Sequence, residues 1–247
     1  MADLSLVAVP MGRWQTNCII VADHASGRGF IVDPGEGAAT RLPELLGELD
    51  VEIEAILLSH GHLDHTWAAP ALAETLDVAI HLHPADRFLW RNPAHTFGVP
   101  DDQAVAVLEG QFGLSWSTAT SRLVDLSEGQ VVTSAGQRVT VTHTPGHTPG
   151  SVTFLLQGVQ GADVAVAVGR DQAAPDDVLM SGDLLFAGSI GRTDFPRGSM
   201  DDMMASLRRH LPTMAADTLV LSGHGPDTTV GAEMATNPYV RQALGTG

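Results

Sequence analysis

The 247-residue chain has 44% hydrophobic side chains, enough for one substantial core that needs no disulfide. We therefore expect a single domain over residues 1–247. Lys and Arg number 13 against 29 Asp and Glu, so the formal net charge is −16 at pH 7. A surface this acidic repels phosphate backbones, which excludes nucleic acid as an expected partner.

The cysteine content and the N-terminus bear on where the protein works. The single cysteine, Cys18, cannot form an internal disulfide, and inside an apolar run it is expected to be a small buried residue. The first residues lack the basic and long apolar regions of a secretory signal. No segment approaches the roughly 18 apolar residues that span a bilayer. These features predict a cytoplasmic protein without membrane contact, and they leave its oligomeric state open.

The chain reads as short strands separated by Gly and Pro turns, with amphipathic helices between them. In the first half, strands are predicted over residues 4–9, 18–21, 30–32 and 55–58, and helices over residues 40–49 and 66–76. In the second half, strands are predicted over residues 123–126, 137–143, 151–156, 178–180 and 218–221, and helices over residues 200–210 and 232–244. Residues 158–177, rich in Gly, Ala and Asp, are predicted to form a surface excursion. This alternation predicts an α/β fold.

Aromatic residues gather between residues 85 and 116. This segment holds Phe88, Trp90, Phe97, Phe112 and Trp116, five of the chain's twelve aromatic side chains. Two interpretations stay open: the segment covers a pocket, or it forms a small satellite core under a long connection.

Metal-ligand chemistry concentrates in the loop after the predicted strand over residues 55–58. There, His60, His62, Asp64 and His65 form the pattern His-x-His-x-Asp-His. Alternate residues of an extended segment point the same way, so His60 and His62 can share one ion. Asp64 and His65, at the turn into the next helix, then face a neighbouring position. Four ligand-type side chains within six residues, behind an apolar strand, predict a metal site rather than a solvated surface.

Three further ligand-type residues stand in the same setting. His147, Asp183 and His224 each follow a strand-like run and lie beside glycine, in Pro-Gly-His, Ser-Gly-Asp and Ser-Gly-His. Glycine allows the backbone to turn tightly, so that the side chain can reach inward. With the first motif, these residues make a set of seven candidate ligands.

These motifs resemble the metallo-β-lactamase superfamily and, within it, the hydroxyacylglutathione hydrolase (glyoxalase II)-like branch. The resemblance runs along nearly the whole chain, from Thr16-Asn17-Cys18 and Val32-Asp33-Pro34-Gly35 through Gly188-Ser189-Ile190-Gly191-Arg192-Thr193-Asp194 to Gly223-His224-Gly225-Pro226. It implies a four-layer αβ/βα sandwich with the active site along one edge. It also implies a first metal on His60, His62 and His147, a second metal on Asp64, His65 and His224, and Asp183 as a bridge between them.

Ligand chemistry agrees with this implied assignment. Three imidazoles suit zinc, while a carboxylate with two imidazoles suits zinc, iron or manganese. We therefore expect two divalent ions, with zinc as the first candidate, and we assign catalytic roles to Asp64 and Asp183 as their carboxylate ligands. Two such ions would bring the pKa of a shared water toward neutrality and supply a hydroxide nucleophile. Because a thiolate leaves with little protonation, the expected substrate is a small-molecule thioester.

Two residues outside the ligand set also carry predictions. Arg192 lies nine residues after Asp183, where the resembled enzymes place a basic contact to the glutathione carboxylate, so it is expected to bind substrate. The alternative is an arginine that stabilises its own loop. Asp33 ends a predicted strand near the site and is expected to orient a metal-binding imidazole. Asp194 and Pro226 stand where glyoxalase II enzymes have tyrosines, which speaks against glutathione specificity.

Other activities on the same scaffold remain as alternatives. The persulfide dioxygenases resemble it but hold one iron on the counterparts of His60, His147 and Asp183, a set of two histidines and one carboxylate. A β-lactamase would be exported, and an RNA-processing nuclease would have a basic surface, so the sequence favours neither. A metal-binding module without catalysis is the remaining class.

Overall fold

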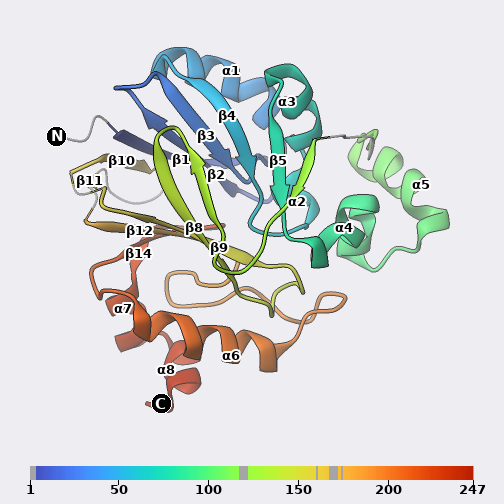
Figure 1. Cartoon of the computed structure of the whole chain (residues 1–247). Coiled ribbons are helices and arrows are strands. Elements are labelled where there is room, and N and C mark those ends of the chain that lie inside the picture. The colour runs from blue at the N-terminus through green and yellow to red at the C-terminus, as the bar shows by residue number, and fades with distance from the viewer. Residues whose placement is uncertain (1–3, 117–121, 160, 167–171, 174, 247) are drawn as a thin grey trace.

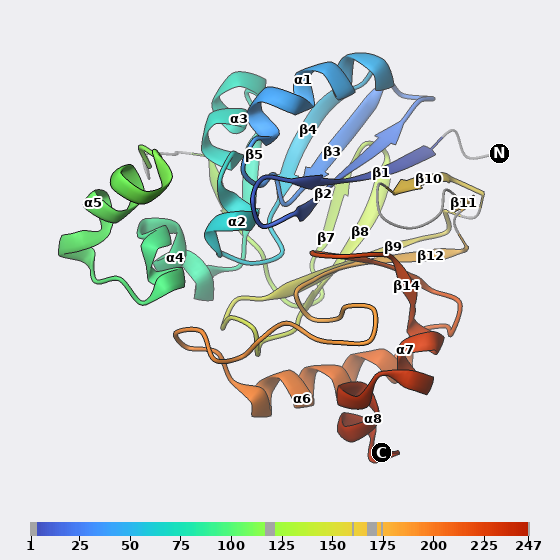
Figure 2. The same cartoon turned by 180° about the vertical axis from the view of Figure 1, so that it is seen from behind.

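Two β-sheets face each other, and helices cover the outer face of each sheet (Figures 1 and 2). This computed structural model describes residues 4–116, 122–159, 161–166, 172–173 and 175–246. The layers are those of the predicted four-layer αβ/βα sandwich.

The first sheet has eight strands in the order β11-β10-β1-β2-β3-β4-β5-β6. They are β1 (Leu4–Met11), β2 (Thr16–Asp23), β3 (Arg28–Val32), β4 (Glu52–Leu57), β5 (Ala79–Leu82), β6 (Leu123–Asp125), β10 (Asp163–Val166) and β11 (Gln172–Ala173). The second sheet has six strands in the order β14-β13-β12-β9-β8-β7. They are β7 (Val131–Ser134), β8 (Gln137–His143), β9 (Val152–Gln157), β12 (Asp177–Gly182), β13 (Leu219–Ser222) and β14 (Thr228–Thr229).

The helices lie outside the two sheets. The longer ones are α1 (Ala38–Leu49), α3 (Ala69–Leu76), α5 (Asp101–Phe112) and α6 (Met200–His210), and the shorter ones are α2 (Leu63–Thr66), α4 (Arg87–Arg91), α7 (Val230–Thr236) and α8 (Pro238–Leu244). The described residues also form three 3-10 turns, η1 (Pro84–Asp86), η2 (Pro93–Phe97) and η3 (Leu211–Thr213). Helices α1 and α3 pack on the first sheet, α6 to α8 pack on the second, and α4 and α5 project to one side (Figure 1).

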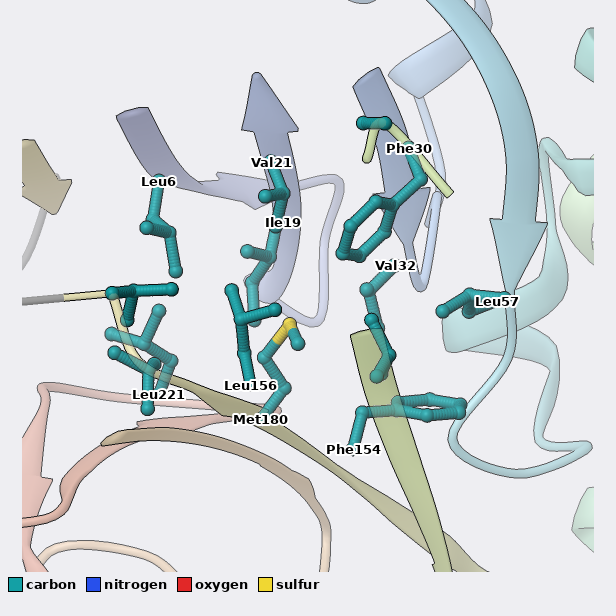
Figure 3. Close-up of a cluster of buried hydrophobic side chains, with 14 of the residues drawn as sticks. Leu6, Ile19, Val21, Phe30, Val32, Leu57, Phe154, Leu156, Met180 and Leu221 are labelled. Carbon is teal, nitrogen blue, oxygen red and sulfur yellow. The ribbon is translucent and has the colours of Figure 1, made fainter. Parts of the chain in front are cut away.

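The main core lies between the two sheets (Figure 3). Alternate residues of each strand point to opposite faces, so Ile19 and Val21 of β2 face this core, while Cys18 and Ile20 face α1 and α3. Phe154 on β9 packs against the first sheet from the opposite side. Cys18 is the buried apolar residue that was predicted, and burial raises the pKa of its thiol.

Most predicted elements are present, but two predicted helices are each divided in two. The helix expected over residues 66–76 is interrupted after Trp67, because Pro70 has no N–H to donate and occupies the first turn of a new helix, α3. The helix expected over residues 232–244 ends at Thr236, and Asn237 accepts hydrogen bonds from the N–H groups of Tyr239 and Val240 to begin α8.

The surface excursion predicted over residues 158–177 is wrong for part of its length. Residues 163–166 form β10, which pairs in parallel with β1 at the edge of the first sheet. The predicted excursion at residues 160, 167–171 and 174 lies outside the described residues. The sequence also gave no prediction for β5 or β7, which have four residues each.

The aromatic segment contributes to a satellite core, which is one of the two interpretations left open by the sequence. Leu63, Ala94 and Leu108 are buried there, and Trp67 and Phe112 pack against them. Across the described residues, none of the helices combines the length and the apolar character that crossing a bilayer requires.

Candidate metal centre

The seven candidate ligands come from both sheets and meet at one edge of the sandwich. His60 and His62 lie in the loop after β4, and Asp64 and His65 lie in α2, which follows it. The loop between β8 and β9 carries His147, Asp183 directly follows β12, and His224 lies two residues after β13. Backbone hydrogen bonds join these loops: the N–H of Val152 donates to the carbonyl of Ser59, and that of Gly223 donates to the carbonyl of Gly182. The site is therefore assembled across the interface of the two sheets.

The first group contains three buried imidazoles. The Nδ1 atom of His62 lies 3.1 Å from Nε2 of His60 and 2.8 Å from Nε2 of His147. Ligand atoms about 2.0 Å from one tetrahedral ion lie about 3.3 Å from each other, so these separations are close to those of a zinc site. The three nitrogens could hold one ion.

The second group contains two imidazoles and a carboxylate. The Oδ2 atom of Asp64 lies 3.2 Å from Nε2 of His224 and 3.5 Å from Nε2 of His65, and the two imidazole nitrogens are 3.3 Å apart. These three atoms could hold a second ion.

Asp183 lies between the two groups. Its Oδ2 is 3.3 Å from Nε2 of His147, and its Oδ1 is 3.4 Å from Nε2 of His65. Within the described part of the chain, the buried Oδ1 accepts no hydrogen bond. A buried carboxylate oxygen without a donor is costly, and a cation removes that cost. The donor set therefore fits two ions that share one carboxylate.

Four of the imidazoles are held from outside by their second nitrogen. Nδ1 of His65 donates to Asp33 at 2.9 Å, and Nδ1 of His60 lies 3.0 Å from the Ser59 hydroxyl, which itself donates to Asp33. The carbonyls of Arg192 and Trp14 accept from Nδ1 of His147 and of His224, at 2.7 and 3.1 Å. A carbonyl acceptor fixes the proton on Nδ1 and leaves the Nε2 lone pair free to bind a metal.

Burial and nearby charges shift the pKa values of the imidazole ligands in different directions. Burial and neighbouring imidazoles lower the pKa of His60 and of His62 well below the usual value, which keeps both neutral. Burial also acts to lower the pKa of His65, but the carboxylates of Asp64, Asp183 and Asp33 outweigh it and raise this pKa to about 10. A cation beside Asp64 and Asp183 would replace the proton on Nε2 of His65, while Nδ1 keeps its hydrogen bond to Asp33.

The glycines beside the ligands do more than permit turns. A Cβ atom on Gly223 would lie 2.3 Å from Oδ1 of Asp183 and 2.9 Å from Cε1 of His65. Gly182 has a φ of +50°, and a Cβ there would lie 2.6 Å from Cβ of Ser59. Both positions need glycine because a side chain would occupy the space of the site.

A pocket of about 260 Å³ opens over both groups. Four aromatic side chains wall it: Trp14, Phe97, Phe186 and Phe195. Phe97 comes from the aromatic segment, so that segment both forms a satellite core and contributes to the pocket wall.

Arg192 lies at this pocket, but its guanidinium already has partners. Its Nε and one terminal nitrogen each donate to the Asp194 carboxylate at 2.7 Å, and its cationic carbon lies 4.3 Å from the centre of the Phe195 ring. The Arg192 partner holds the pKa of the Asp194 carboxyl at about 2. A direct contact of Arg192 with substrate stays a prediction.

Asp86 is a neighbour of the site that sequence reasoning missed. It is fully buried and accepts hydrogen bonds from loops that carry the first group. The chain around it, His83-Pro84-Ala85-Asp86, has no motif that marks it as part of the site.

The aromatic residues Trp14 and Phe195 were also missed as wall residues of the pocket, because only the fold brings them to it.

The chain belongs to the metallo-beta-lactamase superfamily, whose family model matches residues 11–160. Its sequence is 32% identical to the hydroxyacylglutathione hydrolase GloC of Haemophilus influenzae, over 96% of this chain and 98% of the relative. Two solved structures are also similar. The B3 metallo-beta-lactamase BLEG-1 has a TM-score of 0.74 and 33% identity, and TTHA1623 in a di-iron-bound form has a TM-score of 0.70 and 32% identity. Each comparison covers 94% of this chain and 98% of the solved chain.

Proposed function

We propose that this protein is a dinuclear metallohydrolase that cleaves thioesters, with hydroxyacyl thiol conjugates as the first substrates to test. The observation that carries the proposal is the position of Asp183, whose two oxygens face a three-histidine group and a group with Asp64. The similarity to GloC supports the substrate class.

The residues divide into two ligand sets. His60, His62 and His147 would hold one ion, Asp64, His65 and His224 would hold the other, and Asp183 would contact both. Bound there, two divalent ions would supply a water of lowered pKa and a Lewis acid for the carbonyl oxygen. Zinc fits both donor sets, while iron or manganese also fits the second.

The rest of the pocket binds and orients the substrate. Its aromatic walls exclude water from the acyl group and fit an apolar or hydroxylated chain. Apart from the candidate ligands, the described lining residues with a proton to donate are Trp14, Thr96 and Arg192. None of these is an acid near neutral pH. An amine leaving group needs such an acid, whereas a thiolate, from a thiol of pKa about 8.5, leaves without one.

The test compares kcat/KM for an S-lactoyl thioester and for a β-lactam on the same metal-loaded protein. We expect the thioester to be cleaved much faster at neutral pH. A β-lactam is the comparison substrate because the structure is similar to the B3 metallo-beta-lactamase BLEG-1. Equal rates, or faster opening of the β-lactam, would contradict the thioesterase assignment.

Persulfide oxidation is the second candidate. The expected iron ligands are His60, His147 and Asp183. Nε2 of His147 lies 3.3 Å from Oδ2 of Asp183, and ligand atoms of His60 lie within 4.8 Å of those of His147 and of Asp183. A set of two histidines and one carboxylate is typical of non-haem iron oxygenases. Oxygen uptake by the iron-loaded protein with a persulfide measures this activity directly. We expect none above the rate of a metal-free control, and sustained uptake would favour the oxygenase.

A further inference from the structure

One buried carboxylate lies behind the first histidine group without belonging to it. Asp86 ends η1, directly after β5, and its side chain is fully buried. Its Oδ2 accepts hydrogen bonds from the Gly61 N–H at 2.9 Å and from the Thr148 hydroxyl at 2.6 Å. Its Oδ1 accepts one from the Gly150 N–H at 2.7 Å. Asp86 therefore joins a loop of the first sheet to a loop of the second.

The donors to Asp86 are the sequence neighbours of the first group. Gly61 lies between His60 and His62, and Thr148 directly follows His147. A movement of either loop would change the 2.8 Å separation between Nδ1 of His62 and Nε2 of His147. The carboxylate therefore contacts both loops that carry these imidazoles.

The packing around Asp86 is as close as its hydrogen bonds. A Cβ atom on Gly150 would lie 2.5 Å from Cγ of Asp86, and one on Gly61 would lie 2.8 Å from Cβ of Leu89. Burial raises the pKa of the Asp86 carboxyl, and the donors from Thr148, Gly61 and Gly150 oppose that rise. Both loops approach Asp86 closely only because these two positions have no side chain.

Asp33, a second buried carboxylate outside the ligand set, contacts different groups. Its Oδ2 accepts a hydrogen bond from Nδ1 of His65, a member of the second group, at 2.9 Å. The Asp33 carboxylate also accepts hydrogen bonds from the N–H and the hydroxyl of Ser59. Because this hydroxyl lies beside Nδ1 of His60, Asp33 contacts His60 indirectly. The hydrogen bonds described for Asp86, in contrast, involve only the loops of the first group.

We propose that Asp86 is a positioning residue for the first metal group, which holds residues 59–62 and 147–151 at the spacing that lets three imidazoles share one ion. The inference rests on the metal binding of the proposed function but not on its thioester chemistry. Metal occupancy at each position is therefore the readout.

The variant Asp86→Asn tests the proposal with little change in volume. An amide offers one acceptor oxygen instead of two, so its NH₂ group must face either the Gly150 N–H or the donors from Gly61 and Thr148. Zinc loading is titrated against a chelator, and anomalous diffraction then gives the occupancy of each position. Hydrogen exchange of the Gly61 and Gly150 amides in metal-free protein supplies a readout independent of the ions. Asp33→Asn is the matched control.

We expect Asp86→Asn to weaken zinc binding at the first group by about 10-fold to 100-fold, while the second group changes by less than about threefold. The Gly150 amide should exchange faster even without metal. Asp33→Asn should instead weaken the second group at least as much as the first. Should Asp86→Asn not fold, Thr148→Val removes one of the three donors and should show a smaller loss at the same group.

The metal occupancies of the wild type and of Asp86→Asn show which of the two proposals is wrong. If the wild type loads both groups and Asp86→Asn loads the first group equally well, this inference is overturned and the proposed function stands. Equal losses at both groups in Asp86→Asn would also overturn it, because the effect would then be general. A wild type that binds no ion at the first group would contradict the proposed function and this inference together.

Discussion

His62 points a different ring nitrogen toward the centre of the site than the other four candidate histidine ligands do. It presents Nδ1, whereas His60, His65, His147 and His224 present Nε2. Two histidines that are two residues apart on an extended segment point the same way but start from different backbone positions. Using different nitrogens lets both reach one point.

The Arg192–Asp194 pair allows a test of substrate charge. If Arg192 contacts a carboxylate of the thiol carrier, Arg192→Ala should raise KM for carboxylate-bearing thioesters by about threefold to tenfold and leave neutral ones unchanged, since exposed ion pairs are weak. Asp194→Ala frees the guanidinium and should lower the same KM. Michaelis parameters for matched charged and neutral thioesters measure both effects. A uniform change across both substrates, or none, would leave Arg192 as a residue that stabilises its loop.

Gly223 offers a test of the space around the second group. In Gly223→Ala, the new Cβ would meet Asp183 and His65, so these side chains must move apart. We expect the second ion to bind about tenfold or more weakly, with the fold kept. A metal titration measures the affinity for the second ion, and circular dichroism shows whether the fold is kept. Unchanged affinity at the second position would show that these side chains do not bind metal in the arrangement described.

Asp64 and Asp183 separate the one-metal and two-metal mechanisms. Asp64→Ala should weaken the second site and remove most of the hydrolysis, and Asp183→Ala should be severe in either mechanism and serves as the control. Metal content, turnover and folding are measured on both variants. A folded Asp64→Ala protein with full metal content and near-normal turnover, beside an inactive Asp183→Ala, would contradict the two-metal mechanism.

At the scale of elements, periodicity predicted those parts whose own residues decide their structure. The helix over residues 200–210 agrees with α6, because Ser199 caps it and its apolar residues follow the helical repeat. The strand β10 was missed because its pairing with β1, more than 150 residues earlier, depends on the fold and not on local composition. The break at Asn237-Pro238 was also missed, although a proline is a local signal that a helix ends or begins.

The candidate site also has residues that the sequence indicated and residues that it did not. The seven candidate ligands were visible because ligand-type residues cluster, or stand beside glycine, after apolar runs. Asp86, Trp14 and Phe195 were not visible, since their importance depends on which loops the two sheets bring together. Sequence thus indicates ligand chemistry, while the supporting contacts require the structure.

Helix α1 contains a glycine that neither a turn nor a close contact requires. Gly47 is exposed, and a Cβ there would meet nothing within 4 Å. Gly47→Ala should therefore raise the free energy of unfolding by about 0.5–1 kcal/mol. Thermal or denaturant unfolding measures the change, and Gly110→Ala in α5 is a matched second case. A loss of stability in both variants would contradict the description of these helix faces.

At the scale of the whole molecule, the metal centre depends on the packing of the two sheets. β4 of the first sheet leads into four of the ligands, and the second sheet supplies the other three. The core between the sheets, with Phe30 and Phe154 among its largest buried side chains, sets their separation. Ions bound across this interface would stabilise the folded state, because the unfolded chain does not hold these ligands together.

The metal content of fully loaded protein distinguishes the two-metal arrangement from a one-metal site. Elemental analysis combined with anomalous scattering counts the ions and places them. We expect two ions per chain, one among His60, His62 and His147 and one among Asp64, His65 and His224, with Asp183 in contact with both. A reproducible single ion under metal-replete conditions, with the Asp64, His65 and His224 position empty, would contradict the two-metal arrangement and favour the mononuclear iron oxygenase.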